Sequence, residues 1–291
     1  NLIRQKDDVS WGPNATFRFP RRGGTGSIWT ECARRLPEEK LRLSTTITKI
    51  DLETKTVTTA NGITIRYDQL VSTLPLRELV KLSGQAQFNP LAKRGLIHSS
   101  SNIFGLGLSG KPAPELATKC WMYFPEDNCP FYRVTVFSNY SPENVPDAST
   151  QWSLMAEVSE SPDKPVNSDG LLKDVIQGAL ATRLIERESD IISTWSYRAG
   201  YGYPTPGLHR DEALSELLPF FDEHDVYSRG RFGAWKYEVS NQDHSFMQGV
   251  EVIERIVNGR EEITMPDPNH ANRAKHPWPF ERWGENLTFD S

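Results

Sequence analysis

The dipeptide Asn61-Gly62 places the strongest constraint on how this chain folds. It lies between two runs, Thr45–Thr59 and Ile63–Arg66, in which Thr, Val and Ile alternate with polar residues. An Asn-Gly pair adopts the left-handed backbone of a tight turn, and alternation at period two is typical of strands that bury one face. The sequence therefore predicts a β-hairpin, followed by a short apolar strand over Leu70–Leu74.

Other segments have helical periodicity. Apolar residues that recur every three or four positions predict an amphipathic helix, and proline ends one. A helix beginning near Thr25 is expected to stop at Pro37, with Ile28, Cys32 and Leu36 on one face. Further helices are predicted over Leu76–Leu82, Asp169–Leu184, Arg210–Phe221 and Asp243–Val257.

Between these helices, residues 98–161 contain four short β-rich runs separated by Pro, Asn and Gly turns, which predicts a meandering sheet. Another strand is expected over Ser189–Tyr197. The layout predicts an α/β (α+β) fold in which a mainly antiparallel sheet domain, residues 91–205, is inserted into a domain formed by residues 1–90 and 206–265. Residues 266–291 are rich in Pro and Asn and are interpreted as a mobile tail.

Composition limits the possible partners. The 291 residues include 33 basic and 38 acidic side chains, a net charge of -5, which argues against nucleic acid bound through a broad basic surface. No apolar run is long enough to span a membrane, and the first residues lack the order of a signal peptide, so a cytosolic location is predicted. Cys32, Cys120 and Cys129 have no metal spacing and are expected to be free thiols.

The glycine-rich stretch RRGGTGSIW resembles a phosphate-binding loop but fails the dinucleotide fingerprint. The third glycine is missing after Gly24 and Gly26, and no core strand precedes the stretch. A tight backbone turn at a helix start is the favoured interpretation.

Aromatic residues and one arginine gather in CWMYFPEDNCPFYRVTVFSNY. Alternate residues of a strand share a face, so Trp121 with Tyr123, and Phe131 with Arg133, could present rings beside a guanidinium. Rings stack on a planar base, and arginine binds phosphate oxygens. The alternative is a sheet with core aromatics and a solvated edge arginine.

A second mixed stretch, SRGRFGAWKYEVSNQDHSFMQG, places Arg231 on a glycine-flanked loop and Tyr237 on the same strand face as Trp235. It continues into a helix start, which favours anions, although Asp243 or Ser245 could serve only as a helix cap. Tyr203 is expected in a proline-rigidified loop, YGYPTP.

Four motifs together carry a family resemblance: WGPNATFRFPRRGGTG, CWMYFPEDNCPFYR, GYPTP and GRFGAWKYEVSNQDHSFMQGVE. In this order they resemble the eukaryotic, fungal-type UDP-galactopyranose mutases. The resemblance implies a flavoenzyme of galactofuranose and cell-wall biosynthesis that interconverts UDP-galactopyranose and UDP-galactofuranose. No protein side chain is the nucleophile there. The N5 atom of reduced FAD forms an adduct with the sugar, and NADPH reduces the flavin.

The resemblance also assigns roles to individual residues. Residues 1–90 and 206–265 would be part of a two-dinucleotide-fold-like FAD-binding domain, residues 91–205 the substrate-binding domain, and the full-length protein a possible homo-oligomer. The residues expected to bind the UDP-sugar are Asn14, Trp121, Tyr123, Arg133, Tyr140, Tyr203, Tyr237 and Asn241, and those expected to bind FAD are Ile47, Arg231, Asn241, Gln242 and Ser245.

The sequence departs from the family because the N-terminal part with the glycine motif and the helical uracil-binding domain does not precede WGPN. A fragment that binds FAD poorly and is inactive is therefore expected, with exposed surfaces on the LVSTLP strand and the final helix. Two alternatives stay open. One is an oxidoreductase similar to amine or protoporphyrinogen oxidases, and the other is a non-catalytic nucleotide-sugar-binding remnant.

Overall fold

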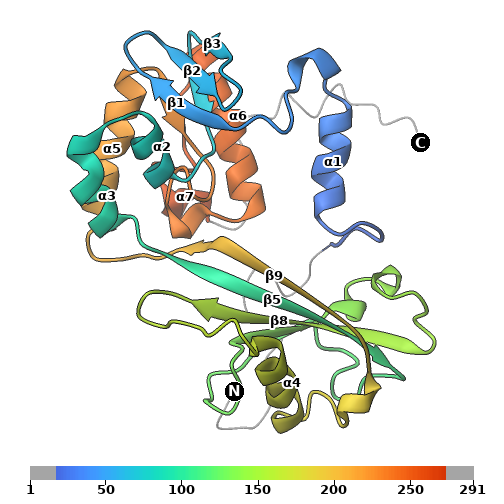
Figure 1. Cartoon of the computed structure of the whole chain (residues 1–291). Helices are drawn as coiled ribbons and strands as arrows, with labels where there is room; N and C mark the ends of the chain where they lie inside the picture. The colour runs from blue at the N-terminus through green and yellow to red at the C-terminus, as the bar shows by residue number, and fades with distance from the viewer. Residues whose placement is uncertain (1–17, 273–291) are drawn as a thin grey trace. The chain divides into compact units, whose positions relative to one another are not determined.

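The computed structural model describes residues 18–272, which form two compact units (Figure 1). Among the described residues, the sheet unit combines residues 18–45 with residues 98–203, and the helical unit combines residues 46–97 with residues 204–272. Each unit thus contains two separate stretches of sequence, whereas the sequence-based division expected the sheet domain to be one continuous stretch, residues 91–205. Residues 18–45 group with the sheet unit, whereas the sequence-based division placed them with the other segment pair.

The sheet unit is built on five strands in the order β6-β7-β8-β5-β9. The long strands β5 and β8 run antiparallel with Leu106 opposite Leu154. The meander is confirmed only for β6, β7 and β8, because β5 pairs with β8 and β9 rather than with β6. The strands are β5 (His98–Ser109), β6 (Trp121–Tyr123), β7 (Arg133–Val136), β8 (Gln151–Glu160) and β9 (Ile191–Pro204).

One face of this sheet forms the core of the unit. Leu106, Leu108 and Leu154 point toward α4 (Leu171–Ala181), whose Val175 is fully buried. Helix α4 approaches closely because Gly178 lies against Cys129 and Pro130, where a Cβ atom would come within 2.9 Å of the Cys129 Cβ. Alternate residues point the other way, so the opposite face is free for polar and aromatic side chains.

Short elements complete the sheet unit. Helix α1 (Gly26–Arg34) confirms the prediction, but none of its residues is buried, and Ile28 on its apolar face is 47% exposed. The preceding turn places Gly23 and Gly24 at positive φ, in agreement with a tight backbone turn. The 3-10 helices are η2 (Glu38–Lys40), η4 (Phe137–Asn139), η5 (Pro142–Asn144) and η6 (Glu188–Asp190).

In the helical unit, the hairpin prediction is confirmed. Strands β2 (Thr56–Thr59) and β3 (Thr64–Arg66) pair antiparallel, with Gly62 at φ 83° in the turn, and β1 (Ile47–Asp51) adds a third strand. The apolar strand β4 (Leu70–Ser72) pairs in parallel with β10 (Val226–Ser228), which the sequence pattern had not revealed.

Helix α5 (Arg210–Glu223) lies against β10. Buried apolar residues of the unit include Leu217 and Phe221 of α5 and Leu76 and Leu79 of α2 (Leu76–Leu82). The remaining elements are η3 (Ala86–Phe88), α3 (Asn89–Gly95), η7 (Tyr237–Val239), α6 (Gln242–Asn258) and α7 (Pro268–Ala271), of which α3 and α7 were not predicted.

Helix α6 carries an exposed apolar stripe. Phe246, Ile253 and Val257 are 54%, 51% and 69% exposed, although Val252 on the other side is fully buried. The expected exposure of the final helix is therefore confirmed. In the LVSTLP segment Ser72 is buried and Leu70 and Val71 are half-buried, but Thr73 is exposed, so the expected exposure of this strand is only partial.

Candidate functional site

The sheet face opposite the core, called the open face below, carries an arginine and a glutamate that bond to each other. Arg133 on β7 stands opposite Glu157 on β8. The Arg133 Nε donates to Glu157 Oε1 at 2.8 Å, and Nη2 donates to Oε2 at 2.7 Å. The Arg133 side chain is 25% exposed and that of Glu157 only 8%. The arginine is therefore neither a core residue nor a solvated edge residue, but a held cation with one accessible side.

The surroundings keep this arginine charged. Burial alone would lower the pKa of Arg133, but the hydrogen bonds and charge of Glu157 raise it above its usual value. The Tyr132 hydroxyl donates to Glu157 Oε2 at 2.8 Å. Burial, followed by the Glu157 charge, raises the pKa of Tyr132 as well, so this tyrosine stays protonated and remains a donor.

Tyr203 lies beside the arginine. Its hydroxyl is 3.3 Å from Arg133 Nη2, which donates to it. The predicted loop position of Tyr203 is wrong, because β9 extends to Pro204 and holds Tyr203 near its end. A proline can occupy the last position of a strand, since only the ladder hydrogen bond beyond Tyr203 is lost.

Rings gather next to Arg133. Tyr123 stands directly opposite Arg133 on β6, and it is 58% exposed. Tyr140 contacts Trp121 edge-on, with ring centroids 6.3 Å apart, and burial raises its pKa to about 12. Phe19 adds a second edge contact to Tyr140 at 5.1 Å. Trp121, Phe19 and Tyr140 thus form an aromatic cluster, whereas the sequence had predicted a platform of Trp121 and Tyr123.

One member of the predicted platform does not belong to it. Phe131 precedes β7 and is 1% exposed in the core, packed edge-on against Phe124. The prediction that Phe131 shares the arginine's face is wrong, because the strand begins only at Arg133. Glu157 was missed entirely, although its position inside the apolar run WSLMAEV was a signal that a charge there needs a partner.

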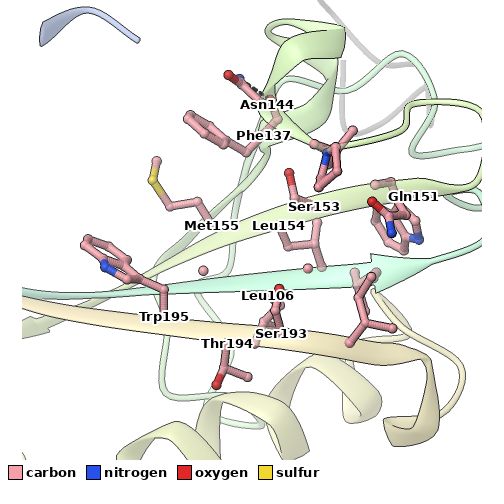
Figure 2. A pocket seen from close by; sticks show the side chains of 17 residues that line it. Leu106, Phe137, Asn144, Gln151, Ser153, Leu154, Met155, Ser193, Thr194 and Trp195 are labelled. Carbon is pink, nitrogen blue, oxygen red and sulfur yellow. Dashed lines mark hydrogen bonds between the residues drawn. The ribbon is translucent and has the colours of Figure 1, made fainter. Parts of the chain in front are cut away.

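The open face continues as a trough of about 620 Å³ over β5, β8 and β9. Figure 2 shows Phe137, Met155 and Trp195 around it. Gly107 lies in its floor, where a Cβ atom would collide with Ser193. Within the described chain, Gln151 Oε1 and Ser153 Oγ are buried without a hydrogen-bond partner. The trough offers apolar area and unpaired polar atoms on the face that carries Glu157, since Met155 and Glu157 are two residues apart on β8 and therefore share a face.

In the helical unit, Arg231 lies on the predicted glycine-flanked loop, with Gly230 at φ 88°. Trp235 anchors this loop because it is fully buried and its Nε1 donates to the Ile97 carbonyl at 3.2 Å. Tyr237 is 50% exposed at the start of η7. The predicted strand for Trp235 and Tyr237 is wrong, since Trp235 has φ 53° and no strand passes through it.

The loop leads into the N-terminus of α6, where Asn241 is the N-cap residue but accepts no capping bond through its side chain. Asn241 and Gln242 are exposed and Ser245 is half-buried. The His244 Nδ1 atom is buried without a partner among residues 18–272, and a Cβ atom on Gly249 would meet nothing within 4 Å. An uncapped helix start with an orphaned ring nitrogen and open space fits a polar cofactor, although Asp243 in the first turn opposes an anion.

Two other predicted residues complete the set. Ile47 opens β1 at an irregular register with Thr59 and is half-buried. Asn14 lies outside the described residues.

Cys32, Cys120 and Cys129 are all free, as predicted. Among the described residues, none of the helices is both long and apolar enough to cross a membrane.

Comparison with known proteins defines the class. A family model described as flavin containing amine oxidoreductase matches residues 3–232. The chain belongs to this family, and the predicted α/β (α+β) fold class is confirmed.

The crystal structure of a reduced UDP-galactopyranose mutase is similar over 94% of this chain, with 47% sequence identity and a TM-score of 0.88. The chain spans 59% of the length of that mutase.

More distant structures share only the fold. A putative protoporphyrinogen oxidase from Exiguobacterium sp. 255-15 has 16% identity and a TM-score of 0.66, covering 81% of this chain and 51% of its own. A fatty acid isomerase from P. acnes has 14% identity and a TM-score of 0.58, with 80% and 52% covered.

Proposed function

We propose that this chain provides the diphosphate-binding sheet and part of the flavin-binding domain of a UDP-galactopyranose mutase. The observation that carries the proposal is the Arg133 site. A charged guanidinium, a tyrosine hydroxyl 3.3 Å away and an exposed ring at Tyr123 lie together on one sheet face. The similarity to the mutase structure at 47% identity supports the same conclusion.

The proposed chemistry assigns the side chains to charge stabilisation. Departure of UDP from the anomeric carbon leaves negative charge on the diphosphate, and pre-positioned donors lower the free energy of that charge. Arg133 supplies a permanent cation, and Tyr203 supplies a hydroxyl beside it. Tyr123 opposite Arg133 and the contacting rings of Trp121 and Tyr140 would offer apolar surface to the nucleotide sugar. When bound, reduced FAD supplies the electron pair that displaces UDP.

In the helical unit we assign the flavin contacts to Ile47, Arg231, Asn241, Gln242 and Ser245, and we assign Tyr237 and Asn241 to the nucleotide sugar. The uncapped start of α6 supports the assignment of Asn241, because its side chain is not engaged in capping. The proposal has further parts. Asn14 is assigned to the nucleotide sugar, and NADPH is assigned as the reductant of the flavin. The protein is proposed to be cytosolic, of fungal type and assembled into a homo-oligomer.

Calorimetric titration with UDP tests the proposed function. The protein is expected to bind UDP, and Tyr203→Phe is expected to weaken that binding about 10-fold, because a hydrogen bond to a charged group contributes roughly 1.5 kcal/mol. Tyr197→Phe is the matched control, since Tyr197 lies on the same strand, is 58% exposed and stacks on Trp195, while the Nε and Nη2 donors of Arg133 go to Glu157 and Tyr203. Equal affinity of the unmodified protein and the Tyr203 variant would contradict the assignment.

An amine oxidase function is the competing assignment within the family. It gives no reason for Arg133 and Tyr203 to lie together on one face. Peroxide release from a primary amine, measured with FAD added and without UDP, would favour that function over the mutase.

A further inference from the structure

Arg133 is held by two residues outside the expected site, Glu157 and Tyr132. We propose that Glu157 and Tyr132 are positioning residues that fix the Arg133 guanidinium so that its Nη1 edge faces the anion. The proposal rests on the proposed function, which places a diphosphate at Arg133, and adds how that arginine is oriented.

The carboxylate of Glu157 is itself fixed. It emerges from β8, which is paired on both sides, with Arg133 opposite on β7 and Ile103 opposite on β5. Its Oε2 accepts hydrogen bonds from both Arg133 Nη2 and the Tyr132 hydroxyl, at 2.7 and 2.8 Å. The Tyr132 amide also donates to the Glu157 carbonyl at 3.0 Å. Backbone and side chain thus determine the position of the acceptor.

This arrangement divides the guanidinium into two edges. A guanidinium has five N–H donors in a rigid plane. The Nε donor and both Nη2 donors bond to Glu157 and to the Tyr203 hydroxyl. Nη1 donates to no group in the described part of the chain, so its two hydrogens are the ones available to an incoming oxygen. Fixing one edge of a planar fork determines where the other edge points.

Two physical arguments predict opposite outcomes when Glu157 is removed. Glu157 neutralises the arginine, so an argument from charge alone predicts that an anion binds more tightly without it. The positioning argument predicts weaker binding, because the freed guanidinium must be ordered again at each binding event. The sign of the change therefore distinguishes a positioning residue from a simple counter-charge.

The same strand provides a matched control. Glu160 on β8 accepts two hydrogen bonds from Arg198, both at 2.8 Å, in the same bidentate geometry. The Arg198 side chain is 52% exposed and is assigned to no ligand. Glu160→Ala removes an equivalent ion pair from the sheet without altering Arg133.

The experiment compares UDP affinities by calorimetry in Arg133→Ala, Glu157→Ala, the double variant, Tyr132→Phe and Glu160→Ala. We expect Arg133→Ala to weaken binding at least about 10-fold and Glu157→Ala roughly 5- to 10-fold. The double variant should bind no more weakly than Arg133→Ala, since Glu157 acts only through the arginine. Tyr132→Phe should weaken binding about 2- to 3-fold, and Glu160→Ala should leave it unchanged.

Unchanged or tighter binding in Glu157→Ala would overturn the inference. The inference would also be overturned if the loss of UDP affinity in the double variant equalled the product of the two single losses, because independent losses indicate general damage to the sheet. If Glu157→Ala does not fold, the isosteric Glu157→Gln and Tyr132→Phe provide the same test.

Inorganic pyrophosphate separates this inference from the proposed function. Binding of pyrophosphate without binding of UDP would contradict the mutase function, and the same variants would then test positioning with pyrophosphate. Binding of neither ligand would refute both proposals. A response to Arg133→Ala but not to Glu157→Ala or Tyr132→Phe would refute positioning alone.

Discussion

Both units of this protein contain bidentate arginine–glutamate pairs, and two of these, Arg133–Glu157 and Arg229–Glu262, differ in how much of the arginine stays accessible. In the sheet unit, Arg133 keeps 25% of its side chain exposed against Glu157. In the helical unit, the side chains of Arg229 and Glu262 are 1% and 3% exposed. The geometry of the two forks is alike, with two short N–H to carboxylate contacts in each.

The number of donors used explains the difference. Arg229 donates to Glu262 through Nε and Nη2, to the Ser228 carbonyl through Nη1, and more weakly to Asp222. Arg255 joins the same carboxylates, at 2.6 Å from Asp222 and 2.9 Å from Glu262. All donors of Arg229 are occupied, so this arginine can only stabilise the fold. An arginine fork is available to bind a ligand when one edge remains unpaired and exposed.

The largest effect is expected from Arg229→Met. It leaves Glu262 buried without its main partner, so the free energy of unfolding should fall by about 3 to 5 kcal/mol. Urea unfolding measures this change. Arg198→Met is the control, because its pair with Glu160 is solvent-exposed and should contribute no more than about 1 kcal/mol. Equal losses in the two variants would show that the Arg229 cluster is not more buried in solution.

The second-largest effect concerns the stability of the folded protein at low pH. Burial would raise the pKa of Glu262, but the hydrogen bond and charge of Arg229 and then those of Arg255 lower it below its ordinary value of 4.5. Because the folded-state pKa is depressed, the Glu262 contribution is complete above pH 4.5 and is lost as the pH falls through the folded-state pKa.

Glu262→Gln should therefore be less stable at neutral pH by roughly 2 to 3 kcal/mol, and its stability should vary less between pH 5 and pH 2 than that of the unmodified protein. Unfolding followed by circular dichroism at several pH values measures both quantities. Parallel pH curves for the two proteins would contradict the assigned pKa direction.

A smaller effect on stability is expected from Arg133→Met. The free energy of unfolding should fall by only about 1 to 2 kcal/mol, since water can reach the partly exposed pair once the guanidinium is gone. Affinity for UDP, in contrast, should be unaffected by Arg229→Met in the folded protein. A loss of stability as large as that of Arg229→Met would remove the distinction between the two pairs.

The smallest effect is expected at the start of α6. Asn241 makes no capping bond through its side chain, so Asn241→Ala should change the free energy of unfolding by less than about 0.5 kcal/mol. Asp267→Ala provides the comparison, because Asp267 accepts a hydrogen bond from the His270 amide at 2.9 Å. A loss of about 1 kcal/mol in Asn241→Ala would indicate that this side chain caps the helix instead of remaining available to a ligand.

Local sequence determined much of this protein. The Asn61-Gly62 turn and the alternation around it were sufficient for the hairpin, because the positive φ of Gly62 and the period of two are local properties. The periodicity of α2, α4, α5 and α6 was equally sufficient for the helices. Four ordered motifs, read as a resemblance, indicated the similarity to UDP-galactopyranose mutases.

Tertiary structure decided the pairing and the chemistry of the side chains. The strand β10 exists because it pairs in parallel with β4, from which it is distant in sequence, and no local pattern encodes that partner. The same holds for β5 beside β8, for Phe131 in the core, and for Tyr203 at a strand end next to Arg133. Only the cross-strand register placed Glu157 opposite Arg133. The sequence named Arg133 as a candidate ligand and did not single out Arg229. The burial of each arginine, and thus the number of its unpaired donors, follows from contacts between residues far apart in the chain.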